Sequence, residues 1–224
     1  MSMNAIYRGP GDCPAMVPLF PLPGALLLPR GQMPLNIFEP RYLAMVDDAL
    51  KSHRLIGMIQ PDEGAEDGSR LVPPLYSVGC IGRITQIAET GDGRYLLTLT
   101  GVARFEIVEE VRALTPYRQA KVSYSRFASD FEARAGEDEV DRAGLLRALK
   151  EFALANELKI DWKGVNEAPN EALVNALSMM APFGPKEKQA LLEAGDLKTR
   201  AEMLVAITEM ELARSGSDSD TTLQ

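Results

Sequence analysis

The stretch MVPLFPLPGALLLPRGQMPLNIFEPRYLAM, residues 16–45, decides the fold. Its apolar runs are interrupted by prolines, which fix φ and remove a backbone donor, so it cannot form one central strand or one helix. The apolar side chains between the prolines still need burial. We therefore expect short, bent strands with turns at Pro23-Gly24 and Arg30-Gly31, wrapped into a small barrel or pseudo-barrel.

A helix follows this stretch directly. Pro40 suits the first position of a helix, because the backbone N–H that proline lacks has no partner there. Apolar side chains then recur at helical spacing, at Leu43, Val46 and Leu50. Residues 40–51 are therefore predicted to form an amphipathic helix that packs against the strands.

The residues after this helix alternate between apolar and polar in the manner of strands. The candidate strands are residues 54–60, 80–89, 95–100, 102–111 and 117–124. Gly91–Arg94 is predicted to be the turn of a β-hairpin, and Gly101 to end a strand. No stretch alternates strand with helix, so this half is predicted to be a mixed, largely antiparallel β domain with one helix.

The strand pattern stops near Ser125 and helical spacing replaces it. Helices are predicted over residues 138–158, 169–180, 186–194 and 197–214, with Trp162 in a link and Asp196 as the N-cap of the last helix. The fold class is therefore α+β. We expect a flexible arm at 1–13, a β-rich subdomain at 14–125, a linker at 126–138, a helical bundle at 139–214 and a disordered tail at 215–224.

Composition and charge exclude several classes of protein. The 224 residues carry a formal net charge of −8 with no basic run, which argues against a nucleic-acid partner. The start lacks the pattern of a signal peptide, and no apolar run is long enough to cross a bilayer. Cys13 and Cys80 make no disulfide framework, and no cluster has metal-ligand spacing. We expect a cytoplasmic protein with no membrane partner, no metal and no cofactor.

Several strings, in order along the chain, match one known family. They are PLFPLP at 18–23, PLNIFEPRY at 34–42, GRYLLTLTG at 93–101 and EKQALLE at 187–193. On these strings the chain resembles the Lon N-terminal domain family, the substrate-binding module of ATP-dependent Lon proteases, in its small stand-alone bacterial form. The resemblance runs from about Val17 to Leu212. It implies a PUA-like β subdomain followed by a helical bundle.

The same resemblance sets the expected function. The chain has no GxxxxGK[ST] loop to hold nucleotide phosphates, and it ends before a protease domain could begin. We therefore expect a non-catalytic module that recognises unfolded or extended polypeptide segments as an adaptor for a protease or chaperone. Two alternatives stay open: a small-ligand-binding PUA-like domain, and an oligomerising scaffold.

The candidate binding residues are Phe38, Glu39, Arg41 and Tyr42, with Arg104 as a fifth. In the functional interpretation they border a groove for an extended peptide, in which arginine holds carboxylate or main-chain oxygens and tyrosine offers a flat apolar face. In the architectural interpretation the carboxylate sits by the helix N-terminus, the arginine pairs with an acid and the tyrosine packs inward.

Other features favour structural roles. His53 suits the C-terminus of the helix over residues 40–51, and Cys80 suits a small core position. Methionines at helical spacing, which can form an adaptable binding face, are expected in the core. They are Met45, Met58, Met179, Met180, Met203 and Met210. An unpaired strand edge within residues 17–34 is a further candidate, because an extended peptide can add to it as a strand.

Overall fold

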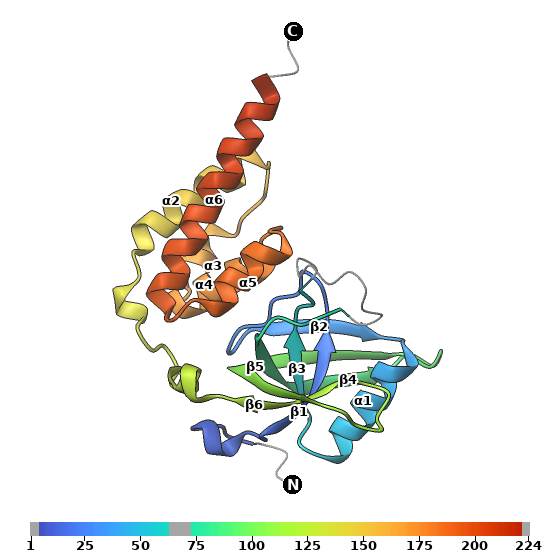
Figure 1. The fold of residues 1–224 in the computed structure, drawn as a ribbon. Helices are drawn as coiled ribbons and strands as arrows, with labels where there is room; N and C mark the ends of the chain where they lie inside the picture. The colour runs from blue at the N-terminus through green and yellow to red at the C-terminus, as the bar shows by residue number, and fades with distance from the viewer. Residues whose placement is uncertain (1–4, 63–72, 221–224) are drawn as a thin grey trace.

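The computed structural model describes residues 5–62 and 73–220 of the chain. A β half and a helical half lie side by side (Figure 1). The α+β class is confirmed: a six-stranded mixed sheet comes first among the described residues, and helices follow.

The strands form a closed barrel with one strand added at its side. They are β1 (Met16–Pro21), β2 (Gln32–Ile37), β3 (Leu55–Ile59), β4 (Val78–Glu89), β5 (Tyr95–Val111) and β6 (Gln119–Ser123). Their order is β2-β5-β4-β3-β1-β6, and a further β5–β6 pairing closes the ring. The β1–β3 pair is parallel and the other pairs are antiparallel. Pairing with β5 alone places β2 outside the ring.

The proline-rich stretch bends as expected. Gly24 has φ 69° and Arg30 has φ 64°, so both predicted turns use left-handed backbone. The apolar run at 26–28 is buried at 1% exposure or less. In β1, Met16–Pro18 pair with β6 and Leu19–Pro21 pair with β3. Among the described residues, β2 and residues 85–89 of β4 each pair with β5 alone and so lie at sheet edges.

Gly101 does not end a strand, contrary to the sequence prediction, because β5 runs through it to Val111. The loop before β2 packs onto this point: Gly101 N donates to Gly31 O at 2.8 Å, and Arg30 N donates to Gly101 O at 2.8 Å. A Cβ on Gly101 would lie 2.0 Å from the Leu28 carbonyl oxygen. Glycine is therefore required here by the close approach of two backbones.

Helix α1 (Pro40–Lys51) has the predicted bounds. Its C-terminal half is held to the barrel by two tyrosines from other strands and loops. Tyr95 Oη donates to Asp47 Oδ1 at 2.9 Å, and Tyr117 Oη donates to Asp48 Oδ2 at 2.8 Å. Burial and then the hydrogen bond to Asp48 raise the pKa of Tyr117 to about 12.

The helical half comprises α2 (Arg142–Ala155), α3 (Trp162–Glu167), α4 (Asn170–Met180), α5 (Pro185–Glu193) and α6 (Leu197–Asp220). Asp196 caps α6 as predicted, since its Oδ1 accepts from Thr199 N at 2.7 Å. The first helix begins later than expected, because Asp141 is its N-cap and accepts from Gly144 N at 3.0 Å. Trp162 begins the short helix α3 and does not lie in a link.

The expected flexible arm at 1–13 and disordered tail at 215–224 stay predictions, and residues 1–4 and 221–224 lie outside the described residues. Helix α6 continues to Asp220, past Ser215. In the predicted arm, Tyr7 accepts a hydrogen bond from Arg83 Nη1 at 2.9 Å and Cys13 packs on the barrel core. Burial, then the charge of Asp12, raises the pKa of Cys13 to about 12.

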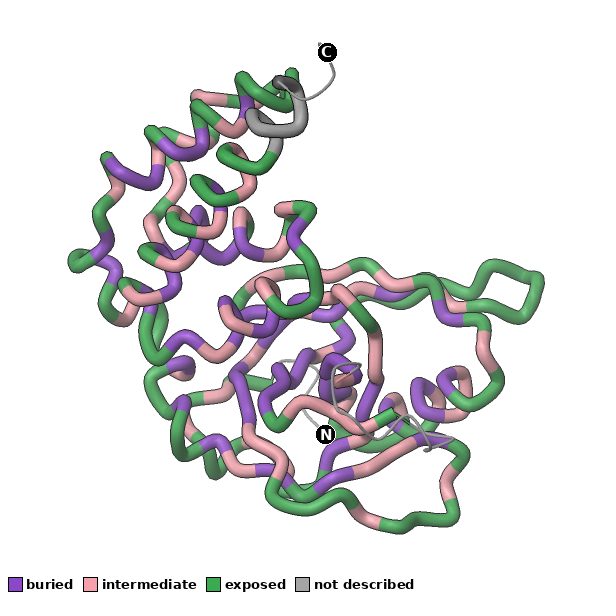
Figure 2. The backbone as a smooth tube through the Cα atoms, turned by 45° about the horizontal axis from the view of Figure 1, so that its top comes forward, coloured by how far each residue is buried: buried purple, intermediate pink, exposed green. Residues whose placement is uncertain are grey.

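The two halves share a hydrophobic core. One cluster of buried side chains joins Leu28 and Leu99 of the β half to Val174, Leu191 and Leu204 of the helical half. A second cluster fills the barrel around Phe105. The segment between the halves contains the 3-10 helices η2 (Ser125–Phe131) and η3 (Glu137–Glu139), and Phe127 in η2 is 1% exposed. The halves therefore pack as one body (Figure 2).

Candidate functional site

The start of α1 gathers four of the candidate residues. Glu39 is the N-cap residue, and its Oε2 accepts from Arg41 Nε at 2.8 Å. The Arg41 guanidinium lies over the Tyr42 ring, 4.4 Å from its centroid. Tyr42 turns inward, is 6% exposed and packs on Phe20 with ring centroids 4.3 Å apart. Burial raises the pKa of Tyr42.

Most of the polar groups at the start of α1 already make contacts with other residues of the chain. Glu39 and Arg41 neutralise each other at the surface, and Tyr42 contributes to the core. Phe38 is 61% exposed and is the candidate that presents a large apolar surface to solvent. The cluster has the contacts of the architectural interpretation, and its role in binding stays a prediction.

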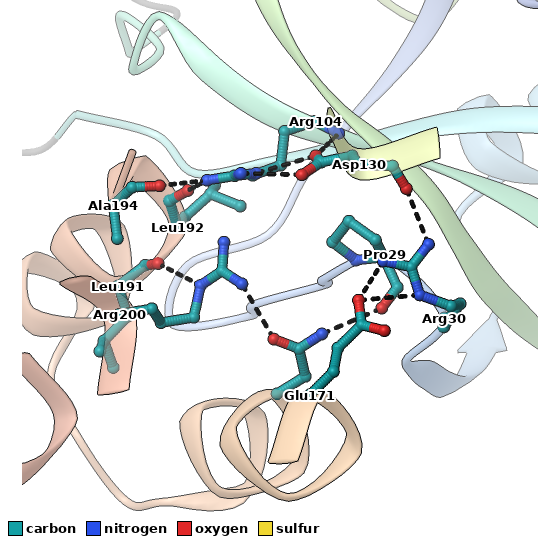
Figure 3. A network of polar contacts seen from close by, with 10 residues as sticks. Pro29, Arg30, Arg104, Asp130, Glu171, Leu191, Leu192, Ala194 and Arg200 are labelled. Carbon is teal, nitrogen blue, oxygen red and sulfur yellow. Dashed lines mark hydrogen bonds and ion pairs between the residues drawn. The ribbon is translucent and has the colours of Figure 1, made fainter. Parts of the chain in front are cut away.

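Arg104 lies elsewhere, between the β half and the helical half (Figure 3). It is 2% exposed and its Nη1 donates to Leu192 O at 3.0 Å and to Ala194 O. Its Nε and Nη2 donate to Oδ2 and Oδ1 of Asp130 at 2.9 and 2.8 Å. The structure therefore separates Arg104 from the α1 cluster and gives it a joining role.

Two more arginines continue this interface (Figure 3). Arg30 donates from Nη1 to Asp130 O at 2.7 Å and from Nε to Glu171 Oε1 at 2.9 Å. Arg200 donates from Nε to Leu191 O and from Nη1 to Asn175 Oδ1, each at 3.0 Å. Burial and then the charge of Arg104 lower the pKa of Arg200. The network fixes α4, α5 and α6 against the barrel.

An apolar hollow lies in the helical half. A cavity of about 470 Å³ opens between α2, α3, α4 and α6. Its wall is formed by apolar side chains, including Leu145, Leu149, Leu173, Leu177, Phe183 and Leu204. Leu158 lines this cavity and also a second hollow of about 740 Å³ beside it, which includes Leu154 and Trp162. We call the two together the helical groove.

Large apolar side chains stand exposed at the helical groove. Leu154 is 84% exposed, Met180 81% and Leu158 51%. The rim carries both signs of charge, with Lys150 and Glu157 among its residues. Contiguous exposed apolar surface of this kind marks an interaction site more often than an inert surface.

Sequence reasoning missed the helical groove. Met180 was expected in the core, yet it is exposed, as is Met210 at 57%, whereas Met45 and Met58 are core residues at 0% and 3%. The available signal was the apolar pair Leu154 and Leu158 beside the single Trp162. That signal is weak, because exposure here depends on how separate helices meet.

Cys80 is a core residue at 1% exposure, as predicted. No group of side chains that could hold a metal ion occurs among residues 5–62 and 73–220. Within those same ranges, no helix combines the length and apolar character needed to span a bilayer.

Comparison with known proteins assigns the family. The family model for the ATP-dependent protease La (LON) substrate-binding domain matches residues 16–209. The chain belongs to this Lon substrate-binding domain family. Lon protease 2 of Sorangium cellulosum is 30% identical, with 88% of this chain and 25% of that protein covered. Lon protease 2 of Myxococcus xanthus is 29% identical, with 88% and 24% covered.

Solved structures agree on the fold. The Lon N-terminal domain protein from Xanthomonas campestris superposes with a TM-score of 0.61 at 24% identity, covering 85% of this chain and 97% of that one. The N-terminal domain of Mycobacterium avium complex Lon protease gives 0.62 at 20% identity, covering 87% and 98%. This Lon-family chain spans about a quarter of the length of the curated Lon proteases that it matches.

Proposed function

We propose that this chain is a non-catalytic module that binds unfolded or extended polypeptide segments, with their apolar side chains in the helical groove. The exposure of Leu158 and Met180 at an apolar cavity of about 470 Å³, and of Leu154 at the hollow beside it, carries the proposal. Membership of a family named for substrate binding supports polypeptide as the ligand.

The residues that line the helical groove favour selection of peptides by their apolar content. They do not favour selection of peptides by charge. Lys159 and Asp161 both line the apolar cavity, and Lys150 and Glu157 both line the neighbouring hollow. A rim of mixed sign neither attracts nor repels one class of charged peptide strongly. Apolar side chains gain free energy by leaving water, so segments that a folded protein would bury are the expected ligands.

We place the module as an adaptor that holds such segments for a protease or chaperone, in the cytoplasm. Both cysteines are free, which supports a reducing compartment. The sequence contains no GxxxxGK[ST] loop, which supports a role without ATP hydrolysis. Purified protein incubated with ATP and with casein should release neither phosphate nor peptides; turnover of either at an enzyme's rate would refute the non-catalytic part.

Isothermal titration with a synthetic, tryptophan-free extended peptide carrying Leu and Phe side chains tests the binding site. Met180→Asp places a charge at the groove, and Met210→Asp places the same charge on an exposed methionine of α6 that does not line it. We expect Met180→Asp to raise Kd by about tenfold or more, and Met210→Asp to change it by less than about twofold. Absence of binding by folded wild type, or equal effects of the two variants, would refute the groove assignment.

A further inference from the structure

Arg200 is a buried arginine whose hydrogen bonds go only to uncharged groups. It lies in the first turn of α6 and is 4% exposed. Its acceptors, Leu191 O and Asn175 Oδ1, are a carbonyl and an amide oxygen. Its Nη2 atom has no hydrogen-bond partner within residues 5–62 and 73–220. Arginine is rarely so deeply buried without a charged partner, because its charge loses hydration on burial.

The two carboxylates whose charges act on Arg200 already have arginine partners. Asp130 holds Arg104 through both of its oxygens, at 2.9 and 2.8 Å. Glu171 Oε1 accepts from Arg30 Nε at 2.9 Å. Each of these pairs is neutral, so neither carboxylate is free to balance the charge of Arg200.

The guanidinium groups of Arg104 and Arg200 approach each other at the interface of the two halves. Figure 3 shows the unbonded nitrogen of Arg200 directed toward Arg104. The charge of Arg104 helps to lower the pKa of Arg200, as expected for two like charges close together. Arg104 Nη2 carries two N–H groups, and Asp130 Oδ1 accepts from one of them. Arginine stays protonated at neutral pH, so both groups keep their charge.

We propose that a small inorganic anion, chloride under ordinary conditions, binds between the guanidinium groups of Arg104 and Arg200. The anion accepts a hydrogen bond from Arg200 Nη2 and supplies the negative charge that these groups lack. A water molecule would satisfy the donor but would leave the charge unbalanced. Both arginines are at most 4% exposed, so the position is enclosed and suits a monatomic ion.

This anion would bridge the two halves of the chain. Arg104 belongs to β5 and Arg200 to α6, and only the folded chain brings them together. The anion loses its own hydration on binding, and attraction to two guanidinium groups away from water offsets that loss. Because the unfolded chain has no such site, the anion should stabilise the folded chain by mass action.

Urea unfolding over a chloride series tests the proposal, with gluconate replacing chloride so that the ionic strength stays constant. For wild type, the unfolding equilibrium constant should fall about tenfold for each tenfold rise in chloride above its Kd. Arg200→Met removes the charge and the free donor, so its unfolding constant should change by less than about twofold over the series. Arg94→Met is the matched control, because it removes an arginine whose side chain is 51% exposed, and it should keep the wild-type response.

Crystals of wild type grown in bromide give a second test that needs no variant. The anomalous signal should place bromide within hydrogen-bond distance of Arg200 Nη2. Stability of wild type that does not depend on chloride, an equal response in Arg200→Met, a lost response in Arg94→Met, or water without bromide at Nη2 would each overturn the proposal. If Arg200→Met does not fold, the wild-type series and the bromide position decide. Arg200 does not line the helical groove, so the peptide-binding experiments have a separate outcome.

Discussion

The guanidinium of Arg104 and the carboxylate of Asp130 form a buried two-pronged ion pair, with Nε 2.9 Å from Oδ2 and Nη2 2.8 Å from Oδ1. The side chains are 2% and 7% exposed. Through Nη1, Arg104 also holds the carbonyls of Leu192 and Ala194 at the end of α5. One side chain therefore ties β5, η2 and the helical half together, in addition to the hydrophobic core that the halves share.

Asp130→Asn should destabilise the whole chain. The substitution leaves the Arg104 charge buried without its partner, which typically costs about 3–5 kcal/mol of unfolding free energy. Urea denaturation followed by circular dichroism measures the loss. Glu109→Gln breaks the exposed pair with Lys121, whose side chains are 61% and 54% exposed, and is the matched control at about 1 kcal/mol or less. Equal losses in the two variants would contradict the joining role of Arg104.

Tyr117 should make stability fall at high pH. Its pKa is about 12 in the folded chain against 10.0 for the free side chain. The unfolded state therefore loses its proton first, so the stabilisation is complete below pH 10 and is lost as pH rises from 10 to 12. Tyr117→Phe lacks this contribution, so the difference in unfolding free energy between wild type and variant should shrink over that range. A constant difference from pH 9 to about 12 would refute this assignment.

Gly101→Ala should be poorly tolerated although alanine is only one methyl larger. The new Cβ would stand 2.0 Å from the Leu28 carbonyl oxygen, so the backbone of one segment must move, at a cost of about 1–3 kcal/mol. Gly195→Ala is the control, because nothing lies within 4 Å of its added Cβ, and it should stay within about 0.5 kcal/mol. Thermal denaturation compares them; a Gly101→Ala protein as stable as the control would show that the loop before β2 does not need this close approach.

Arg41→Ala separates the two interpretations of the α1 cluster. If Arg41 only covers the Tyr42 ring and pairs with Glu39, the variant should lose about 0.5–1 kcal/mol of stability and keep its peptide affinity within about twofold. Chemical denaturation and peptide titration give both values. A rise of about tenfold or more in the peptide Kd corresponds to the loss of about one strong contact with the peptide. That result would instead place the peptide at the start of α1.

Local signals determined which parts of the fold the sequence could predict. The bounds of α1 follow from Pro40 and a helical apolar spacing, and the N-cap at Asp196 follows from a carboxylate before a periodic segment. The prediction that Gly101 ends a strand was wrong, because glycine is found both at the ends of strands and where two backbones approach closely. Its contact with Leu28 joins distant segments, which no local pattern reports.

The candidate sites were harder for the same reason. The Arg104–Asp130 pair joins residues 26 positions apart, and Asp130 lies in a segment whose polar composition predicted a linker. The helical groove needs the mutual packing of α2, α3, α4 and α6, since Leu158 and Met180 become its exposed residues only when those helices meet. Periodicity gives the face of each helix but not the gap left between helices.

The fluorescence of Trp162, the single tryptophan of the chain, tests the central claim most directly because it lines the helical groove. We predict that the tryptophan-free peptide produces a saturable change in emission whose midpoint matches the Kd from calorimetry. Met180→Asp should shift that midpoint and Met210→Asp should not. Calorimetric binding of the peptide with no change in Trp162 emission would contradict the account, because the peptide would then occupy another surface.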